Sequence, residues 1–266
     1  MNIKLIAHTE LSDEFYEAIH PISEAVGVNA RSAVALTAIR TCYSPLKPSE
    51  IVAVEGEKYF GNSASDGGKG TDADRLFRQI VRSKHTSTLE HITYTFTVEG
   101  VSRSLLAQLT RHRQFSFSVQ SQRYVKFGSD DKSGGFDYVT PPSVSGKETD
   151  SRKLRGFNED TSESIFTPVS ATEVFDEAMT EIQGVYDRLR KAGVPAEDAR
   201  YVLPNAAACN IVMTGNLRAF LEFYGKRKAG NGAQWEIAEL GEKFREEITK
   251  VDEWVAPFFN PKGDDK

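Results

Sequence analysis

Residues 92–98 constrain the fold most strongly, because their seven side chains alternate strictly between apolar residues and threonine. The apolar members are β-branched or aromatic, and Glu99-Gly100 ends the pattern. Alternation with a period of two residues is typical of a strand with one buried face. The segment therefore predicts a strand whose threonine face is either polar or borders a ligand cleft.

Helical periodicity dominates the second half of the chain. From Ala171 apolar residues recur at helical spacing, and further helices are predicted from Pro195, over residues 216–224 and from Gln234 to about Val255. Earlier elements are a strand over residues 1–7, helices over residues 32–43 and 72–84, and a short helix from Ser102 or Ser104 to about Arg111. Residues 60–72 and 128–155, rich in Gly, Ser and Asp, predict flexible loops, the second with a brief strand at residues 136–139. Together these patterns predict one mixed α+β domain over residues 1–266 with a helical C-terminal half.

Composition favours a reducing compartment. The chain of 266 residues is 39% hydrophobic, enough to bury one substantial core. Its two cysteines, Cys42 and Cys209, cannot build a disulfide framework. Charged residues interrupt the N-terminal segment, and no apolar stretch approaches the ~20 residues of a membrane span. The sequence predicts a cytoplasmic protein without membrane partners, and a net charge of -5 argues against a general nucleic-acid coat protein.

The most unusual segment is the cationic ribbon, which we define as residues 111–124. It contains three Arg, one His, three Ser and three Gln residues and no acidic residue. Guanidinium groups beside hydroxyl and amide donors suit a phosphate and a polar heterocycle. The ribbon therefore predicts an anion pocket, and the alternative is a solvated basic surface.

Two further clusters have ordinary structural alternatives. His85, Glu90 and His91 precede the predicted strand, but their spacing matches no helical ligand pair, which favours a hydrogen-bonded turn over a metal site. Arg200 can form a salt bridge with the neighbouring Asp198 or Glu197. Residues 226–228 are basic, as is common in the last turn of a solvated helix.

These clusters occur in an order that resembles the flavin-dependent thymidylate synthase family. The family motif reads Arg-His-Arg, two residues, Ser, four residues, Ser, one residue and Arg-Tyr. It is matched here by Arg111, His112, Arg113, Ser116, Ser121, Arg123 and Tyr124. The resemblance extends to residues 40–43, 85–91, 200–204, 216–218 and 233–236.

The resemblance implies a central antiparallel or mixed sheet flanked by helices. It also implies methylation of dUMP at C5 with methylenetetrahydrofolate as the carbon donor, FAD as the hydride carrier and NADPH as the reductant. No cysteine nucleophile is required, because arginine donors aimed at the pyrimidine can activate C5 electrostatically. Family members are homotetramers with active sites shared between subunits.

The resemblance also assigns roles residue by residue. The substrate-binding positions are Gln108, Arg111, Gln120, Ser121, Gln122, Arg123, Arg200, Arg227 and Lys228. The cofactor-binding positions are Ser87, Arg111, His112, Arg113, Asn216, Arg218 and Glu222. The catalytic positions are Arg227, Ser121 and His85, and no metal-binding position is implied.

Three positions depart from the family pattern. Val119 stands where a Glu or Gln is usual, with Gln120 beside it, and Glu222 stands where Asn or His often faces the flavin. One inserted residue leaves two candidates for the pyrimidine-activating position, and we favour Arg227 over Lys228 because a planar guanidinium can address two acceptor atoms. Two alternatives follow: a related enzyme that acts on UMP or makes another C5-modified pyrimidine, and a non-catalytic RNA- or nucleotide-binding module with stacking aromatic residues on the ribbon.

Overall fold

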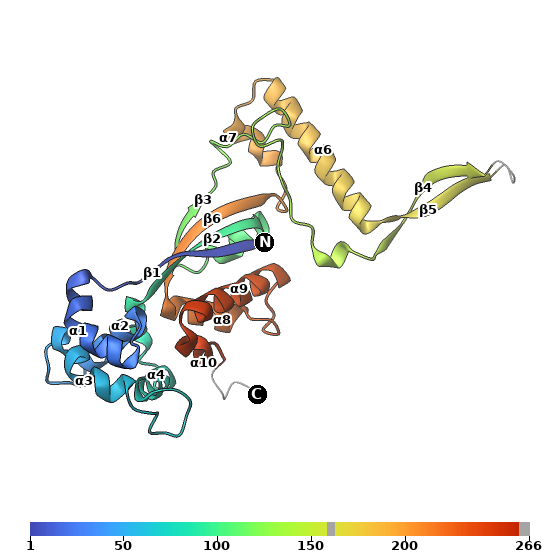
Figure 1. Cartoon of the computed structure of the whole chain (residues 1–266). Coiled ribbons are helices and arrows are strands. Elements are labelled where there is room, and N and C mark those ends of the chain that lie inside the picture. Colours follow the sequence, from blue (N-terminus) through green and yellow to red (C-terminus); the bar gives the residue numbers. More distant parts are fainter. Residues whose placement is uncertain (159–162, 261–266) are drawn as a thin grey trace. The chain divides into compact units, whose positions relative to one another are not determined.

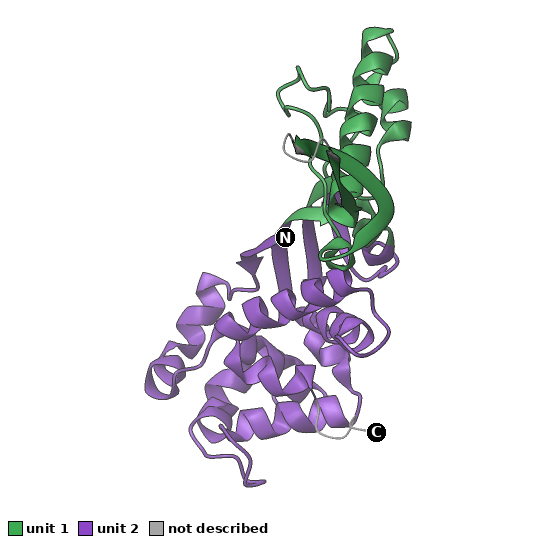
Figure 2. Cartoon of the chain, turned by 90° about the vertical axis from the view of Figure 1, so that its right-hand side faces the viewer, with its two compact units in different colours: residues 1, 99–107, 119–211 green, residues 2–98, 108–118, 212–266 purple. Residues whose placement is uncertain are grey.

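The computed structural model describes residues 1–158 and 163–260. Its contacts divide the chain into two compact units, shown in Figure 2. Unit 1 comprises residues 1, 99–107 and 119–211, and unit 2 comprises residues 2–98, 108–118 and 212–266. The fold is mixed α+β, as predicted. The expected single domain over residues 1–266 stays a prediction.

A four-stranded sheet contains the strand predicted at residues 92–98. Its strands lie in the order β1 (Asn2–His8), β2 (Thr93–Ser102), β6 (Ala208–Asn216) and β3 (Ser116–Val119). The apolar residues Tyr94, Phe96 and Val98 of β2 are completely buried. On the threonine face, the Thr95 and Thr214 hydroxyls lie 2.9 Å apart, which ties β2 to β6.

Seven α-helices of unit 2 accompany this sheet in the described part of the chain (Figure 1). They are α1 (Asp13–Val26), α2 (Ala30–Thr41), α3 (Ile51–Phe60), α4 (Asp72–Arg82), α8 (Leu217–Arg227), α9 (Trp235–Val251) and α10 (Ala256–Phe259). Thr71 begins α4 with a complete capping box, and the loop before it lies where the sequence predicts one. The core is aromatic: Phe96, Phe220 and Phe244 pack with ring centroids 4.9 to 5.4 Å apart.

A buried polar network lies beside this aromatic core. The Asp252 carboxylate is fully buried and accepts from Arg31 Nε at 2.7 Å and from the Tyr94 hydroxyl at 2.8 Å. The Trp254 indole nitrogen donates to the second carboxylate oxygen at 3.1 Å. Burial, together with the nearby carboxylate, raises the pKa of Tyr94 far above its usual value. The network joins β2 to α2 and to the segment that follows α9.

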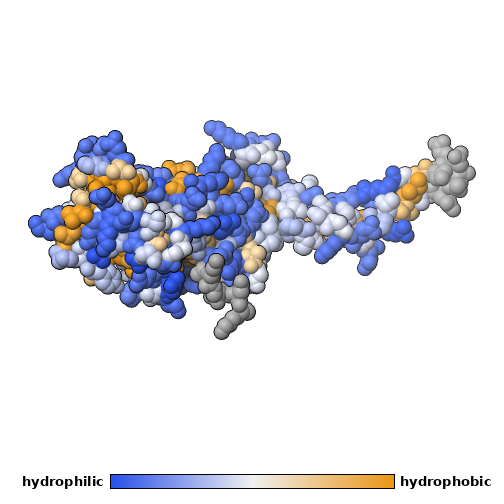
Figure 3. Space-filling model, turned by 60° about the horizontal axis from the view of Figure 1, so that its bottom comes forward, coloured by the Kyte–Doolittle hydropathy of each residue, from blue (hydrophilic) through white to orange (hydrophobic). Residues whose placement is uncertain are grey.

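Unit 1 contains a hairpin and a long helix. The strands β4 (Glu148–Asn158) and β5 (Glu163–Ser170) pair antiparallel, and α6 (Ala171–Lys191) begins directly after them with Ser170 as its cap. The helices α5 (Arg103–Leu109) and α7 (Ala196–Ala199) are short. The unit has a small core around Phe127, Tyr186 and Ala199. Hydrophobic residues are exposed on the hairpin, as Figure 3 shows; they are Leu154, Phe157, Ile165 and Phe166.

The structure corrects two predictions about residues 128–155. The expected strand at residues 136–139 is only an isolated bridge between Tyr138 and Ala207, because Pro141 and Pro142 follow at once and proline cannot donate to a ladder. The end of the expected loop belongs to β4 instead. None of the helices in the described residues is both long and apolar enough to cross a membrane.

Candidate active site

The first half of the cationic ribbon forms a turn in unit 2 between α5 and β3. Phe115 is buried and packs against Phe220 and Phe223, with ring centroids 4.9 and 5.8 Å away. Gly215 makes room for this ring, because a Cβ there would lie 2.3 Å from the ring's Cδ1. With Phe115 fixed in the core, Arg111 and Arg113 on the same turn are exposed. The turn thus presents two guanidinium groups to solvent.

His112 lies within this turn and contacts the end of α8. Its Nε2 accepts a hydrogen bond from Arg227 Nε at 3.0 Å, so this nitrogen carries no proton in the observed arrangement. Burial, and then the positive charges of Arg227 and Lys226, hold the pKa of His112 below its usual value. The ring also stands edge-on against Phe223, with centroids 4.8 Å apart. A predicted cofactor residue and the predicted pyrimidine-activating residue are therefore neighbours, whereas Lys228 ends α8 as its C-cap.

Arg218 lies in the first turn of α8 and contacts two carboxylates. Its Nε donates to Glu222 at 2.8 Å, and its Nη1 donates to Glu90 at 2.6 Å. The departure at Glu222 is thus accounted for locally, since its charge is paired with Arg218 one turn earlier. Asn216 caps the helix by accepting from the Ala219 amide at 2.8 Å.

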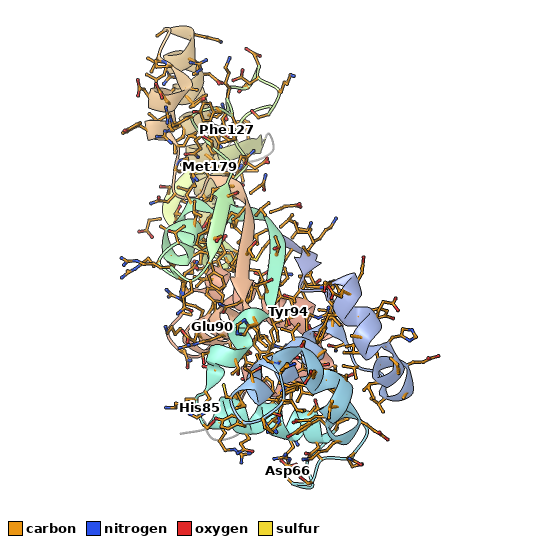
Figure 4. The ribbon with its side chains drawn as sticks, turned by 90° about the vertical axis from the view of Figure 1, so that its left-hand side faces the viewer. Asp66, His85, Glu90, Tyr94, Phe127 and Met179 are labelled. Atoms are coloured by element: carbon orange, nitrogen blue, oxygen red, sulfur yellow. The ribbon has the colours of Figure 1, made fainter. Side chains whose placement is uncertain are left out.

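The turn before β2 is hydrogen-bonded, which agrees with the interpretation that the sequence favoured. His85 precedes the 3-10 helix Thr86–His91, and its carbonyl accepts from the Thr88 hydroxyl at 3.1 Å. The Tyr43 hydroxyl lies 3.3 Å from His85 Nδ1. Figure 4 shows His85 and Glu90 on this turn, with Tyr94 beyond it on β2, and Ser87 on the same turn is exposed. No cluster of three or more metal-ligating side chains occurs among the described residues.

The second half of the ribbon lies in unit 1 and contacts α7. Arg123 Nε and Nη2 lie 3.1 and 3.0 Å from one carboxylate oxygen of Glu197. Arg200 Nε donates to the main-chain carbonyl of Glu197 at 3.0 Å. The sequence interpretation that paired Arg200 with an acidic side chain is wrong in detail, because the Glu197 carboxylate binds Arg123 instead. Both arginines therefore contact Glu197, and Ser121 Oγ accepts from the main-chain amide of Arg123 at 3.2 Å.

The remaining predicted substrate residues are less exposed. Gln122 is buried, and Gln108 is half-buried at the end of α5. Gln120 Oε1 accepts from the Asn210 side chain at 3.3 Å, and the main-chain N–H of Gln120 donates to the main-chain carbonyl of Asn210 at 2.9 Å. Asn210 also accepts from the Gly100 amide at 3.1 Å. Sequence reasoning missed Asn210 altogether. It named Glu197 only as a possible partner of Arg200 and missed its contact with Arg123, which lies 74 residues away in the sequence.

Known proteins share both the sequence and the fold. Residues 27–254 match the family described as thymidylate synthase complementing protein. A flavin-dependent thymidylate synthase of Geobacter sulfurreducens is 39% identical over 226 residues, which cover 85% of this chain and 78% of the relative. One of Clostridium tetani is 32% identical over 218 residues, covering 82% of this chain and 78% of the relative.

Solved structures agree in fold. A flavin-dependent thymidylate synthase of Helicobacter pylori complexed with FAD and dUMP superposes with a TM-score of 0.59 at 19% identity, covering 98% of each chain. The UMP/dUMP methylase PolB of Streptomyces cacaoi, bound with 5-Br dUMP, superposes with a TM-score of 0.62 at 24% identity, covering 97% of this chain and 93% of that chain. At these sequence identities the superpositions show only that the fold is shared. Membership of the family is shown by the family match and by the two relatives from Geobacter sulfurreducens and Clostridium tetani. The chain belongs to the family of flavin-dependent thymidylate synthases.

Proposed function

We propose that this protein is a cytoplasmic thymidylate synthase that methylates dUMP at C5 with methylenetetrahydrofolate, FAD and NADPH. The observation that carries the proposal is the complete Arg-His-Arg motif, Arg111 to Arg113 with Ser116, Ser121 and Arg123-Tyr124. It occurs in a chain that is 39% identical to the Geobacter sulfurreducens synthase. The structure also shares its fold with a synthase that was solved with FAD and dUMP, which is consistent with the proposed chemistry.

The donor set of unit 2 fits a flavin dinucleotide. Arg111 and Arg113 are exposed on one turn. Ser87 lies on the same 3-10 helix as Glu90, and Glu90 accepts a hydrogen bond from Arg218 of α8. Guanidinium and hydroxyl donors are the usual partners of a pyrophosphate. These residues would therefore hold FAD, which when bound and reduced supplies the hydride that completes the methyl group.

The nucleotide phosphate is assigned to unit 1. Arg123 and Arg200 supply two positive charges around Glu197, and the Ser121 hydroxyl keeps its own proton available as a donor while its oxygen accepts from the Arg123 amide. Gln120 and Gln122 offer further amide groups from the same ribbon. A dianionic phosphate and a polar sugar match this set of donors.

Arg227 is the residue that we assign to activation of the pyrimidine. C5 of uracil becomes nucleophilic when electron density moves toward it from N3 and O4, and a guanidinium at those atoms stabilises the negative charge that develops there. The neutral His112 ring fixes Arg227 through its Nε, which leaves the terminal nitrogens for the substrate. His85, held by Tyr43, is assigned to the flavin and folate side of the site.

A thiol nucleophile does not enter the proposal. Cys209 is buried on β6, and Cys42 lies at the C-terminus of α2, where its Sγ faces the Ala38 carbonyl. We expect Cys42→Ser and Cys209→Ala variants to retain turnover, because electrostatic activation needs no covalent adduct.

We further propose that the active form is a homotetramer in which several subunits contribute to each active site. The residues assigned to the phosphate and those assigned to the flavin fall in different units of the chain. If the sites are shared, dilution weakens activity and flavin retention together. Light scattering of the purified protein measures the mass directly, and a monomer with full activity would contradict the proposal.

One experiment tests the proposed activity. The purified protein is incubated with dUMP or UMP, methylenetetrahydrofolate and NADPH, and the nucleotide product is identified by mass spectrometry. We expect a yellow protein that forms dTMP from dUMP. Product from UMP alone would indicate the related C5-modifying enzyme, and a colourless protein with salt-sensitive RNA affinity would indicate the binding module.

A further inference from the structure

One acidic residue of unit 1 contacts both arginines that we assign to the phosphate. Glu197 binds Arg123 through its side chain and Arg200 through its main-chain carbonyl. The first contact brings together two segments far apart in the sequence, whereas the second spans less than one helical turn. Glu197 is therefore the shared partner of the two guanidinium groups.

The atoms used in these contacts leave the ends of both guanidinium groups open. Nε and Nη2 of Arg123 lie along one edge of the planar group, and both approach the same Glu197 oxygen, at 3.1 and 3.0 Å. Arg200 likewise uses Nε. Elsewhere in the described residues, neither Arg123 Nη1 nor the terminal nitrogens of Arg200 find a hydrogen-bond acceptor. Phosphate oxygens bind best to two parallel N–H groups, which is what such an open end provides.

Fixing the arginines before the ligand arrives favours binding. Arginine has a long side chain, and ordering it when the ligand binds reduces the affinity. Glu197 also brings a negative charge near the phosphate, which opposes binding. The side chains of Arg123 and Glu197 are 53% and 48% exposed, so water screens this repulsion more than it weakens the short directional contacts.

We propose that Glu197 is a positioning residue for the nucleotide phosphate: its carboxylate orients the open end of Arg123 beside Arg200, which its main-chain carbonyl holds, and it does not itself contact the substrate. The inference rests on the proposed function, because dUMP is taken as the ligand. It also goes beyond that function, since it assigns a role to an acidic residue beside an anionic ligand.

The test compares three variants of the full-length, FAD-loaded protein: Glu197→Ala, Glu197→Gln and Asp198→Ala. Asp198 is the matched control, because it is exposed, carries the same charge in the next position and contacts neither arginine side chain. The dissociation constant of dUMP is measured by calorimetry, and kcat is measured at saturating dUMP.

We expect Glu197→Ala to raise the dissociation constant about tenfold, because Arg123 then has to be ordered by the ligand. Glu197→Gln keeps an oxygen acceptor at the same place, so we expect it to stay within about threefold of the unmodified protein. Asp198→Ala is expected to change little. Since positioning affects binding of the phosphate and not the reacting atoms, kcat remains unchanged while KM follows the dissociation constant. In an Arg123→Ala background, Glu197→Ala has no further effect.

Three results would overturn the inference. Tighter dUMP binding in both Glu197 variants would show that the carboxylate competes with the phosphate. An unchanged dissociation constant of dUMP in Glu197→Ala would show that the carboxylate does not position Arg123. The same conclusion would follow if Glu197→Gln weakened dUMP binding as much as Glu197→Ala does. If the unmodified, FAD-loaded protein bound no dUMP, the proposed function itself would fail, and this outcome is recognised before any variant is compared.

Discussion

Replacing Gly215 by alanine tests how firmly the core of unit 2 determines the position of the Arg111–Arg113 turn. A Cβ at residue 215 would lie 2.3 and 2.4 Å from two carbons of the Phe115 ring and 3.2 Å from Phe220. Carbon atoms in contact are separated by roughly 3.5 to 4.0 Å, so the Phe115 ring has to move by about 1 Å. Phe220 and Phe223 leave it little space, because their ring centroids are 4.9 and 5.8 Å away.

We expect Gly215→Ala to lower the free energy of unfolding by about 1–3 kcal/mol, the usual cost of overpacking a core. Movement of Phe115 also shifts the preceding turn, so FAD content per chain should fall. The measurements are urea unfolding followed by tryptophan fluorescence and the flavin absorbance of the purified protein.

Gly241→Ala is the matched control, because it makes the same chemical change in the neighbouring helix α9. Its Cβ would lie 3.7 Å from Phe223 and Tyr224, an ordinary contact distance. Replacing a glycine inside a helix should stabilise the protein by about 0.5–1 kcal/mol. In a Gly215→Ala background, Phe115→Leu should recover part of the lost stability, because leucine leaves room for the added methyl group. Equal stability and full flavin content in Gly215→Ala would refute the reasoning.

Three further predictions follow from the contacts described above. Arg123→Ala should raise the dissociation constant of dUMP by at least about tenfold, since it removes a charge-assisted hydrogen bond to phosphate, while flavin content per chain stays constant; equal loss of both would contradict the assignment. The pKa of His112 is lowered by burial and then by Arg227. The neutral ring therefore contributes fully to stability when the pH is above 6.5, the usual pKa of histidine, and this contribution is lost as the pH falls below that value. Urea unfolding between pH 7.5 and 5.5 should therefore show a decline that is smaller in His112→Gln. Asp252→Ala should destabilise the protein by about 3–5 kcal/mol, because it leaves the Arg31 guanidinium, only 8% exposed, without its closest partner; a loss below about 1 kcal/mol would show that the network relaxes.

Local patterns predicted the elements whose burial is periodic. The alternation at residues 92–98 identified β2, and the helical spacing after Ala171 identified α6. The strand β6 was missed although Cys209, Ile211 and Met213 alternate with more exposed residues and are buried. Its pattern is weak because the intervening positions are partly apolar.

Other elements were missed because their signals conflict. The helix α1 has Ser12 as a cap and acidic residues in its first turn, but Pro21 lies inside it and suggests an interruption. The hairpin β4–β5 is rich in charged residues, and two of them, Lys153 and Arg155, form ion pairs with Glu173 of α6. A strand stabilised by ion pairs with a following helix has no clear alternation between polar and apolar residues.

Residue types in the candidate site could be predicted, but the contacts between them could not. The motif indicated His112 and Arg123 as members of a site, and the wider resemblance added Arg200 and Arg227. Their actual partners depend on the fold: His112 meets Arg227 from a distant helix, and one residue, Glu197, meets both of the other arginines. Sequence spacing suggests contacts within one helical turn but not contacts between distant segments. For this reason the Glu197 carboxylate was paired with Arg200, three residues away, and not with Arg123.

The two carboxylates that surround Arg218 have a consequence for which anions this part of the protein accepts. Glu90 and Glu222 together outweigh the single positive charge of Arg218, so the local charge sums to minus one. A small free anion such as inorganic phosphate would have to displace a carboxylate from Arg218, and at this partly exposed site we expect that exchange to bring little gain. A large ligand that spreads its interactions over several neighbouring groups can offset that loss. We therefore expect the two carboxylates around Arg218 to favour large anionic ligands over small ones.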